Sequence, residues 1–539
     1  MTLRFGSAYQ CTARMSLSAL CDFLVRELKL TRRPAHRSAT VIWDTFDHRL
    51  YAAGGVLFRD EAEDATIFWE PERGSARVTT SPWPTEEERV FSHDLAEDKT
   101  GKELRELIAM RALLPQVRIS GRSVELIQEN KSGKVLARIR VHALEAGALG
   151  CEKPAKLRKR VTVEPLRGYE KAAKSIEATL MKHPDFARAK QDLVSQAYAQ
   201  ADLELGVYNA KPVISMAGNE RADTATKRVL ARNHSIMRAN MSGLLADIDS
   251  EFLHDFRVAV RRSRAVIRLV KAVFPPSVTA RFAADLKEIG RVTSAPRDHD
   301  VLMLTIDKYL ECLPGHDRAV GESLRDLLSS DRTSGQRSLE QTLKAANYRS
   351  FDRRWAAFLA KPPPAKSSAP NAAMPIGELI RGRTWKAYRR VRAQGDNITP
   401  KSPAQSLHDL RKDCKRLRYL LGLFRSLHPQ AEAKAVIGEL KRLQEVLGDH
   451  QDLEAHAEMI EARGRVLQEN PATPAATLEL VKSLVKHLGE RQDATRQLFA
   501  AAYERFLREE NTERIRSLCG RPQKQKAKPS KVASKRSRR

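Results

Sequence analysis

The sequence predicts an α+β domain followed by an all-α domain that contains two copies of one helical module. Two observations support this prediction. Residues 1–148 hold short runs of β-branched and aromatic residues between turn signals, which favours an antiparallel sheet. From residue 222 onward, apolar residues recur at helical spacing, and one basic motif occurs twice.

The α+β domain begins with a helix over Met15–Leu30, for which Ser16 is the expected N-cap. A second helix is expected at Lys102–Leu113, and Asn130–Gly133 is a turn that joins the last two strands as a hairpin. The expected strands are Ala39–Trp43, Val56–Phe58, Ala65–Trp69, Ala76–Thr79, Val117–Ile119, Val124–Ile127 and Val135–Val141.

The rest of the chain divides by composition. A segment with proline and glycine at Tyr208–Asp223 breaks the helical pattern, and a Pro/Ala/Ser-rich segment at Pro362–Pro375 separates the two copies. The predicted parts are an α+β domain (1–148), a helical connector and linker (149–221), a helical domain (222–510, with repeats at about 222–360 and 376–510) and a disordered basic tail (511–539).

The repeated motif places a stripe of cations beside an apolar face. The first copy runs from His254 to Arg264 and the second from His408 to Arg418, so the offset is 408 − 254 = 154. Each stripe covers about 15 Å of helix, which suits a long polyanion. The stripes are His254, Arg257, Arg261 and Arg264 in the first copy, and His408, Arg411, Lys415 and Arg418 in the second. The apolar faces are Phe256, Val260, Ile267 and Phe274, and Leu410, Leu417, Leu421 and Phe424.

The duplication extends beyond the motif. Leu286 aligns with Leu440 at the same offset, since 440 − 286 = 154, and Asp300 then aligns with Asp452 at 452 − 300 = 152, which implies a two-residue slip at a turn. A unit of this length is too long for a solenoid. Two such modules packed around a pseudo-two-fold axis would bring both basic helices to one surface.

These residues resemble the CHAD family, the conserved-histidine α-helical domains. The resemblance covers roughly residues 222–510, rests on both half-motifs in order and is strengthened by the Arg297-Asp298 turn. It implies two pseudo-symmetric four-helix bundles whose facing basic helices line a channel for inorganic polyphosphate, and a cytoplasmic protein associated with polyphosphate granules. The binding residues that it implies are His254, Arg257, Arg261, Arg264, His408, Arg411, Lys415 and Arg418, flanked by Arg262, Lys412 and Arg416.

The segment Trp43–Arg59 looks like part of the CYTH family, the triphosphate-tunnel enzymes, which often precede CHAD domains. However, the family's opening Glu-x-Glu-x-Lys strand has no counterpart before residue 40. Without paired carboxylates, nothing holds Mg²⁺ against a triphosphate. The sequence therefore predicts a degenerate CYTH-like domain without hydrolase activity and without a cofactor, and a metal-dependent triphosphate or polyphosphate hydrolase is the alternative.

Composition sets further limits. The net charge of +28, from 95 Lys and Arg against 67 Asp and Glu, attracts nucleic acid, anionic membranes or another polyanion. Six scattered cysteines indicate neither a disulfide framework nor a zinc site. No apolar run has the length of a membrane span. Of the partners that the charge allows, a membrane is not expected. Nucleic acid stays an alternative partner, through the basic surface or the basic tail.

Other roles for polar residues in the repeats stay open. His254 and His408 are expected to donate hydrogen bonds to phosphate or to a neighbouring helix, while metal ligation, phosphohistidine chemistry and acid–base catalysis are alternatives. The acidic residues near the repeat turns are expected to cap helix starts rather than to act chemically. They are Asp298, Asp300, Asp449 and Asp452.

Overall fold

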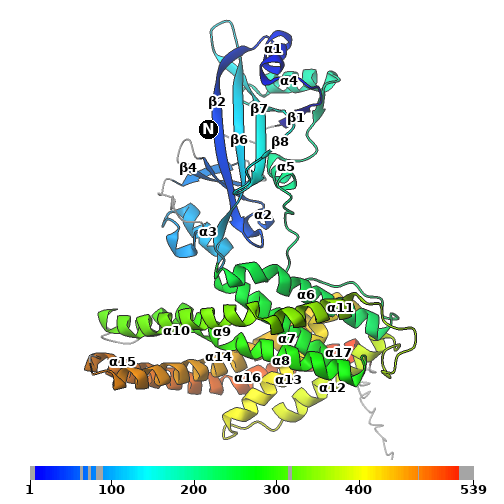
Figure 1. Cartoon of the computed structure of the whole chain (residues 1–539), viewed down its shortest axis with the longest axis vertical. Helices are drawn as coiled ribbons and strands as arrows, with labels where there is room; N and C mark the ends of the chain where they lie inside the picture. Colours follow the sequence, from blue (N-terminus) through cyan, green and yellow to red (C-terminus); the bar gives the residue numbers. More distant parts are fainter. Residues whose placement is uncertain are drawn as a thin grey trace, which may run out of the picture. The chain divides into compact units, whose positions relative to one another are not determined.

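The computed structural model describes residues 7–60, 65–70, 75–79, 89–312, 318–471 and 473–520. The chain divides into two compact units, Met1–Asn209 and Ala210–Arg539. Every described strand belongs to the first unit, and the second unit is helical (Figure 1). The prediction of a sheet-containing region followed by a helical region is therefore confirmed.

The first unit is built on one antiparallel sheet. Among the described residues its strand order is β10-β1-β9-β7-β6-β2-β3-β4-β5, and β8 pairs with β7. The strands are β1 Ser7–Cys11, β2 Thr31–Thr45, β3 Val56–Asp60, β4 Ala65–Glu70, β5 Ser75–Thr79, β6 Leu113–Glu129, β7 Val135–Ala148, β8 Ala155–Lys156, β9 Arg160–Pro165 and β10 Phe186–Arg188. The helices are α1 Leu17–Leu28, α2 Arg49–Ala52, α3 Lys99–Ile108, α4 Glu170–Lys182 and α5 Leu193–Gln200.

Helices cover both faces of this sheet. Val124 of β6 and Val141 of β7 belong to a core with α1 and α4, whereas Val117 of β6 belongs to a core with α5. Side chains alternate between the faces of a strand, so the even and odd positions of β6 serve different cores. The long central strands thus hold the unit together.

Local predictions for this unit hold at several elements. Ser16 caps α1, because its side chain accepts a hydrogen bond from the backbone N–H of Ala19 at 3.1 Å. The Asn130–Gly133 turn joins β6 to β7, and Gly133 has a φ of +79°, which glycine adopts without strain. The two predicted strands at Val117–Ile119 and Val124–Ile127 are one strand, β6.

The predicted boundary at residue 148 is wrong. Strands β9 and β10 and helices α4 and α5 lie in the segment that was expected to be a helical connector, and they complete the first unit. β9 pairs with both β1 and β7, so the sheet needs it. The non-helical part of the expected linker, from Ala201 to Arg221, contains the division between the two units.

The second unit repeats one order of helices. In the first repeat these are α6 Ala222–Leu245, α7 Ser250–Leu269, α8 Pro276–Val292, α9 Ser294–Glu311, α10 Arg318–Lys344 and α11 Ala346–Ala360. In the second they are α12 Ile376–Gly395, α13 Ala404–Leu423, α14 Gln430–Glu469, α15 Ala475–Gln497, α16 Phe499–Phe506 and α17 Glu509–Leu518. The starts of α6, α7 and α8 match those of α12, α13 and α14 at one offset, since 376 − 222 = 404 − 250 = 430 − 276 = 154.

The repeats differ where a turn was expected. Thr293 separates α8 from α9, whereas α14 continues unbroken through the equivalent position. Asp298 lies inside α9, and Asp449 and Asp452 lie in the middle of α14. The prediction that these acids, together with Asp300 of α9, cap helix starts is therefore wrong.

The remaining predicted boundaries are partly right. The segment between α11 and α12 contains no helix, and it is held in place because the Asn371 N–H donates to the Ala272 carbonyl at 2.9 Å. The prediction of a disordered tail from residue 511 is wrong at its start, because α17 buries Ile515 and Leu518. Residues 521–539 lie outside the described residues.

Candidate functional site

Helix α7 carries the first basic motif. Its start is capped by Asp249, whose side chain accepts hydrogen bonds from the backbone N–H groups of Glu251 at 2.9 Å and Phe252 at 3.3 Å. Phe256 and Val260 are completely buried, which confirms the predicted apolar face. Burial of this face fixes the rotation of the helix, so the basic stripe must lie beside the core.

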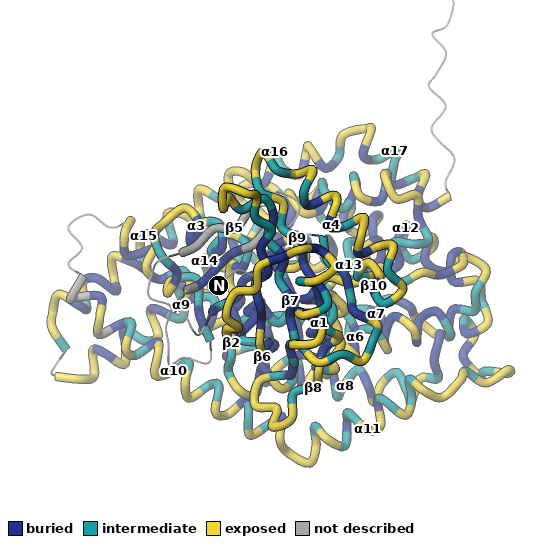
Figure 2. Tube along the Cα trace, turned by 90° about the horizontal axis from the view of Figure 1, so that it is seen from above, coloured by how far each residue is buried: buried dark blue, intermediate teal, exposed yellow. Residues whose placement is uncertain are grey.

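Helix α13 repeats this arrangement. It begins directly after Pro403, and Leu410, Leu417 and Leu421 are completely buried. The backbones of α7 and α13 are in contact (Figure 1). Figure 2 shows buried, intermediate and exposed stretches alternating along the chain, and the residues of α7 and α13 alternate in the same way. The two stripes therefore approach each other within one unit.

Arg257 lies deepest in the α7 stripe, with 9% of its surface exposed. Its guanidinium group donates to the hydroxyl of Thr293 at 3.2 Å and to that of Ser294 at 3.3 Å. Burial lowers the pKa of Arg257 to about 10, and the nearby Arg261 lowers it further, whereas Asp298 opposes the shift. Its contacts hold the charge in place without neutralising it.

Arg411 is the equivalent residue on α13, since 411 − 257 = 154. It lies over Gly448 of α14, donates to the side-chain carbonyl of Gln451 and approaches the Asp452 carboxylate at 3.4 Å. Because Gly448 stands where the first repeat has Ser294 (448 − 294 = 154), Arg411 reaches the next turn of α14 directly. Thus the two equivalent arginines have different partners.

Lys415 lies among other cations. Burial lowers the pKa of its ammonium group to about 8. Arg411 of the same helix, Arg261 of α7 and Arg418 add to the effect, whereas Asp452 opposes it. Burial also lowers the pKa of Arg418, with contributions from Arg261 and Arg411. Cations of both helices therefore act on one another, as the predicted shared surface requires.

Two further arginines of α7, the flanking Arg262 and the stripe residue Arg264, lie at the same surface. Arg262 donates to the backbone carbonyl of Ala210. Burial lowers the pKa of Arg262, Tyr419 and Asp255 oppose the shift, and Arg261 and Arg418 add to it. Arg264 extends over Gly290 of α8, where an added Cβ would lie 2.7 Å from one guanidinium nitrogen. Burial lowers the pKa of Arg264 as well.

The two motif histidines lie at the N-terminal end of each stripe and are partly buried. Burial lowers the pKa of His254 to about 4, and Arg297 adds to the effect, so His254 is neutral at pH 7. A neutral imidazole can donate one hydrogen bond, as expected for a phosphate contact. Among the described residues, no group of three or more His, Cys, Asp or Glu side chains is arranged to hold a metal ion.

The remaining predicted residues have acidic neighbours. Lys412 pairs with Asp409 at 3.0 Å, and Arg416 pairs with the buried Asp413. We name the eleven predicted residues the α7–α13 basic surface. They are His254, Arg257, Arg261, Arg262, Arg264, His408, Arg411, Lys412, Lys415, Arg416 and Arg418.

Comparison with known proteins identifies the region that contains this surface. Residues 228–461 match the family described as the CHAD domain. The helical unit contains a CHAD domain. The match includes both motif helices, α7 and α13.

Two curated relatives come from Mycobacterium tuberculosis, strains CDC 1551 and H37Rv, and both are uncharacterized proteins. Each is 27% identical to this chain over 203 residues, which is 37% of this chain and 38% of the relative. The match thus spans well under half the length of either relative.

Two solved structures are also similar to part of this chain. The CHAD domain from the plant Ricinus communis aligns at 20% identity and a TM-score of 0.44, over 58% of this chain and 96% of the plant chain. PptA from Streptomyces chartreusis aligns at 15% identity and a TM-score of 0.43, over 53% of this chain and 99% of that protein.

Sequence reasoning did not predict that residues of α9 and α14 contact the α7–α13 basic surface. Ser294 links the two charges of the first repeat, because its hydroxyl accepts from Arg257 and lies 3.4 Å from Asp298. Asp298 and Asp452 are equivalent at the constant offset, 452 − 298 = 154, so no slip is needed to align them. The constant offset of 154 residues between the two copies of the basic motif was the available signal.

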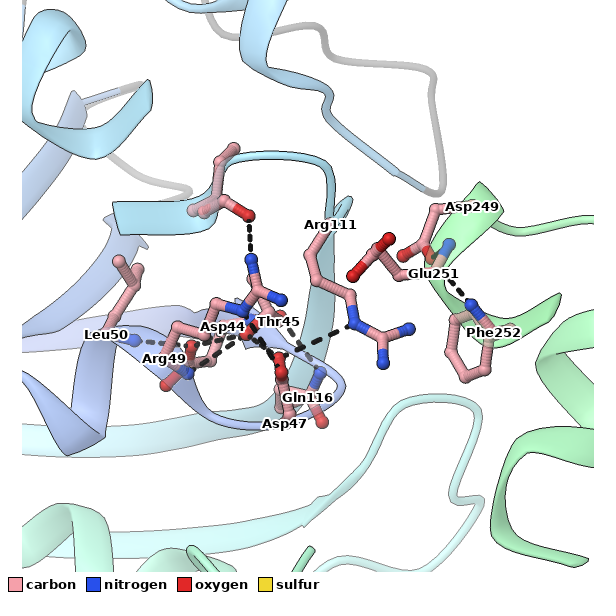
Figure 3. Close-up of polar contacts among 11 residues, drawn as sticks. Asp44, Thr45, Asp47, Arg49, Leu50, Arg111, Gln116, Asp249, Glu251 and Phe252 are labelled. Carbon is pink, nitrogen blue, oxygen red and sulfur yellow. Dashed lines mark hydrogen bonds and ion pairs between the residues drawn. The ribbon is translucent and has the colours of Figure 1, made fainter. Parts of the chain in front are cut away.

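Outside the CHAD domain, the first unit has a polar cluster at the end of β2 (Figure 3). Asp44 accepts hydrogen bonds from the backbone N–H groups of Thr45, Leu50 and Tyr51, and burial raises the pKa of Asp44 to about 6. In the same cluster, the Asp47 carboxylate pairs with the Arg49 guanidinium group at 3.0 Å. These bonds fix the β2–α2 turn, which is a structural role for the Asp-Thr part of the Trp43–Arg59 segment.

An arginine on strand β7 of the first unit also has acidic partners. Arg140 of β7 lies between Glu125 of β6, at 3.6 Å, and Glu164 of β9, at 3.5 Å. The strand register places these three side chains on one face of the sheet. No helix in the described part of the chain has the length and apolarity to cross a bilayer.

Proposed function

We propose that the CHAD domain binds inorganic polyphosphate along the α7–α13 basic surface. The arginines supply planar forks that match phosphate oxygens, and Lys415 supplies a point charge. A flexible chain of phosphates can follow two adjacent stripes, each about 15 Å long. The same reasoning supports a location on polyphosphate granules, where many such chains are displayed.

The observation that carries the proposal is the position of Lys415. Three arginines lower its pKa, and one of them, Arg261, comes from the other repeat. Bringing like charges together in a partly buried place costs stability unless an anion joins them. A polyanion that contacts both helices would relieve this repulsion.

The geometry of the two repeats supports a channel between two four-helix bundles related by a pseudo-two-fold axis. Equivalent helices start at equivalent positions, and α7 contacts α13. In such an arrangement the channel would run between these two helices. This arrangement is part of the proposal.

Nucleic acid is the less favoured ligand. Proteins that bind single strands use aromatic side chains on which bases stack, and Tyr419 is the aromatic residue next to the second stripe. Arginine forks alone can contact any phosphate backbone. Competition between polyphosphate and RNA or DNA at equal phosphate concentration separates the two ligands.

We also propose that the first unit is a CYTH-like fold without hydrolase activity. Strand β1, SAYQC, has no carboxylate that could hold a metal ion, and Arg140 is occupied by two glutamates. The alternative is a metal-dependent hydrolase that receives polyphosphate from the CHAD domain. A phosphate-release assay with Mg²⁺ or Mn²⁺ decides between them, because turnover that is lost in Arg59→Ala would establish the hydrolase.

A filter-binding titration with polyphosphate at increasing salt tests the main proposal. We expect binding at about 50 mM salt that weakens steeply as salt rises, because bound phosphates release counterions. Absence of binding at about 50 mM salt would reject the proposed function. Equal competition by RNA would instead indicate a general polyanion site.

A further inference from the structure

The two halves of the α7–α13 basic surface are not equivalent in their acidic neighbours. Position 413 of α13 is an aspartate, whereas the equivalent position of α7 is Ala259, since 413 − 259 = 154. One residue earlier, Lys412 of α13 corresponds to Val258 of α7. The second repeat thus carries an acid and a cation that the first repeat lacks.

Within the described residues, no arginine of the α7 half forms an ion pair with a carboxylate. Arg257 donates to the hydroxyls of Thr293 and Ser294, and Arg262 donates to the carbonyl of Ala210. Arg264 packs against Gly290, and Arg261 is exposed. Neutral acceptors position a guanidinium group but leave its full charge available to an anion.

Three cations of the α13 half are paired. Arg411 approaches Asp452 at 3.4 Å, Lys412 approaches Asp409 at 3.0 Å, and Arg416 bonds to Asp413. Asp413 also pairs with Arg390 of α12 at 3.4 Å. Lys415 and Arg418 have no such ion pair among the described residues.

We propose that the α7 half is the primary phosphate subsite, formed by Arg257, Arg261, Arg262 and Arg264 and extended across the helix contact by Lys415 and Arg418. Asp409, Asp413 and Asp452 are internal counter-ions that compete with phosphate for the rest of the α13 half. This inference rests on the proposed function, because it assigns unequal roles within the same surface.

The physical reason is a difference in what phosphate must displace. At an arginine held by hydroxyl groups, phosphate replaces neutral acceptors and adds a charge-assisted hydrogen bond. At an arginine held by a carboxylate, phosphate must break an existing ion pair, and the released carboxylate then repels it. Equivalent positions should therefore contribute unequally to affinity.

Variants at equivalent positions test this inference directly. Arg262→Gln on α7 should weaken polyphosphate binding at least tenfold, whereas Arg416→Gln on α13 should weaken it less than threefold. Arg390 still pairs with Asp413 in the second variant, so the buried acid keeps a partner. Arg257→Gln and Arg411→Gln form a second matched pair with the same expected order.

Internal controls separate charge from folding. Arg261→Gln and Lys415→Gln occupy equivalent positions (415 − 261 = 154), and neither residue forms an ion pair within the described part of the chain, so the two variants should lose affinity to within about twofold of each other. Asp452→Asn should strengthen binding about threefold. Thermal unfolding of each variant shows whether a loss of binding comes from misfolding.

The outcomes are distinct. Equal losses at the Arg262 and Arg416 positions, in variants that fold, would overturn the primary subsite, as would weaker binding by Asp452→Asn. If the unsubstituted protein fails to bind polyphosphate at about 50 mM salt, the proposed function itself fails. If it binds and the losses follow the expected order, both stand.

Discussion

Lys415 of α13 and Arg261 of α7 lie within electrostatic range of each other, although 415 − 261 = 154 residues separate them. They are equivalent members of the two repeats. The backbone contact between their helices brings the two stripes into one surface. The repulsion within this surface is the physical basis for expecting an anionic ligand.

Lys415 should make polyphosphate binding depend on pH. Because its pKa is lowered to about 8, Lys415 is protonated at pH 7 and largely neutral at pH 9. A bound polyanion favours the protonated form, so affinity should fall about tenfold between pH 7 and pH 9. Fluorescence anisotropy with labelled polyphosphate measures this fall.

The control for this prediction is Lys415→Arg. Arginine stays charged over the whole range, so the variant should lose most of the pH dependence while keeping its affinity at pH 7 within a few fold. An unchanged pH profile in Lys415→Arg would show that another group titrates.

Gly290→Ala should disturb Arg264. The added methyl group would lie 2.7 Å from a guanidinium nitrogen of Arg264, the end of a flexible side chain that can move away. We expect weaker polyphosphate binding by about threefold, with stability unchanged or raised by up to about 1 kcal/mol. Gly422→Ala on α13, where no atom of the described residues lies within 4 Å of the new atom, is the matched control and should bind normally. Normal binding by Gly290→Ala would remove Arg264 from the site.

Leu417→Ala should destabilise the helical unit. Leu417 is completely buried behind the second stripe, so the substitution leaves a cavity and should cost about 2–5 kcal/mol in the free energy of unfolding. Denaturant unfolding followed by circular dichroism measures the loss. Leu304→Ala, at a side chain that is 46% exposed, should cost less than about 1 kcal/mol. Similar losses in both variants would contradict the burial of the apolar face of α13.

The first unit should lose stability in acid. His142 is buried between Ser123 and Thr162, and burial, aided by Arg140, lowers the pKa of His142 to about 3. The unfolded chain binds this proton near pH 6.5, so the unfolded state gains protons first and stability falls from pH 6.5 toward pH 3.

Hydrogen exchange of the β6 and β7 amides, corrected for the intrinsic effect of pH on exchange, follows this loss. His142→Gln should flatten the profile between pH 6.5 and pH 4. His93→Gln, at an exposed histidine, should keep the original profile. An identical slope in His142→Gln would assign the acid sensitivity to other groups.

Sequence alone predicted the apolar face and the basic stripe of α7 and α13, because the helical spacing of apolar residues and the repeat of the basic motif agree in these two helices. Phe256 and Leu417 are buried as expected, and the stripes approach each other. The pairing of Arg416 with Asp413 was not predicted, although these residues are three apart on one helix.

Other errors come from local signals that tertiary packing overrides. Gly448-Asp449 resembles a turn, yet α14 runs through it, since Leu447 and Leu453 are buried on its core face. The basic run before strand β9 favours a connector, but β9 pairs with β1 from the far end of the unit as well as with the preceding strand β7. Local propensity shows neither the core packing of α14 nor the strand pairing of β9.

The most direct test reverses the charge of the site and of a matched surface. One variant changes Arg257, Arg261, Arg411 and Lys415 to Glu, and the control changes four exposed cations elsewhere in the same unit. The control residues are Arg291, Arg465, Lys482 and Lys486. Both variants alter net charge equally, so a non-specific attraction would weaken equally in both. We predict that polyphosphate binding at about 50 mM salt is lost in the first and kept within about threefold in the second. Equal binding by the two variants would contradict the account.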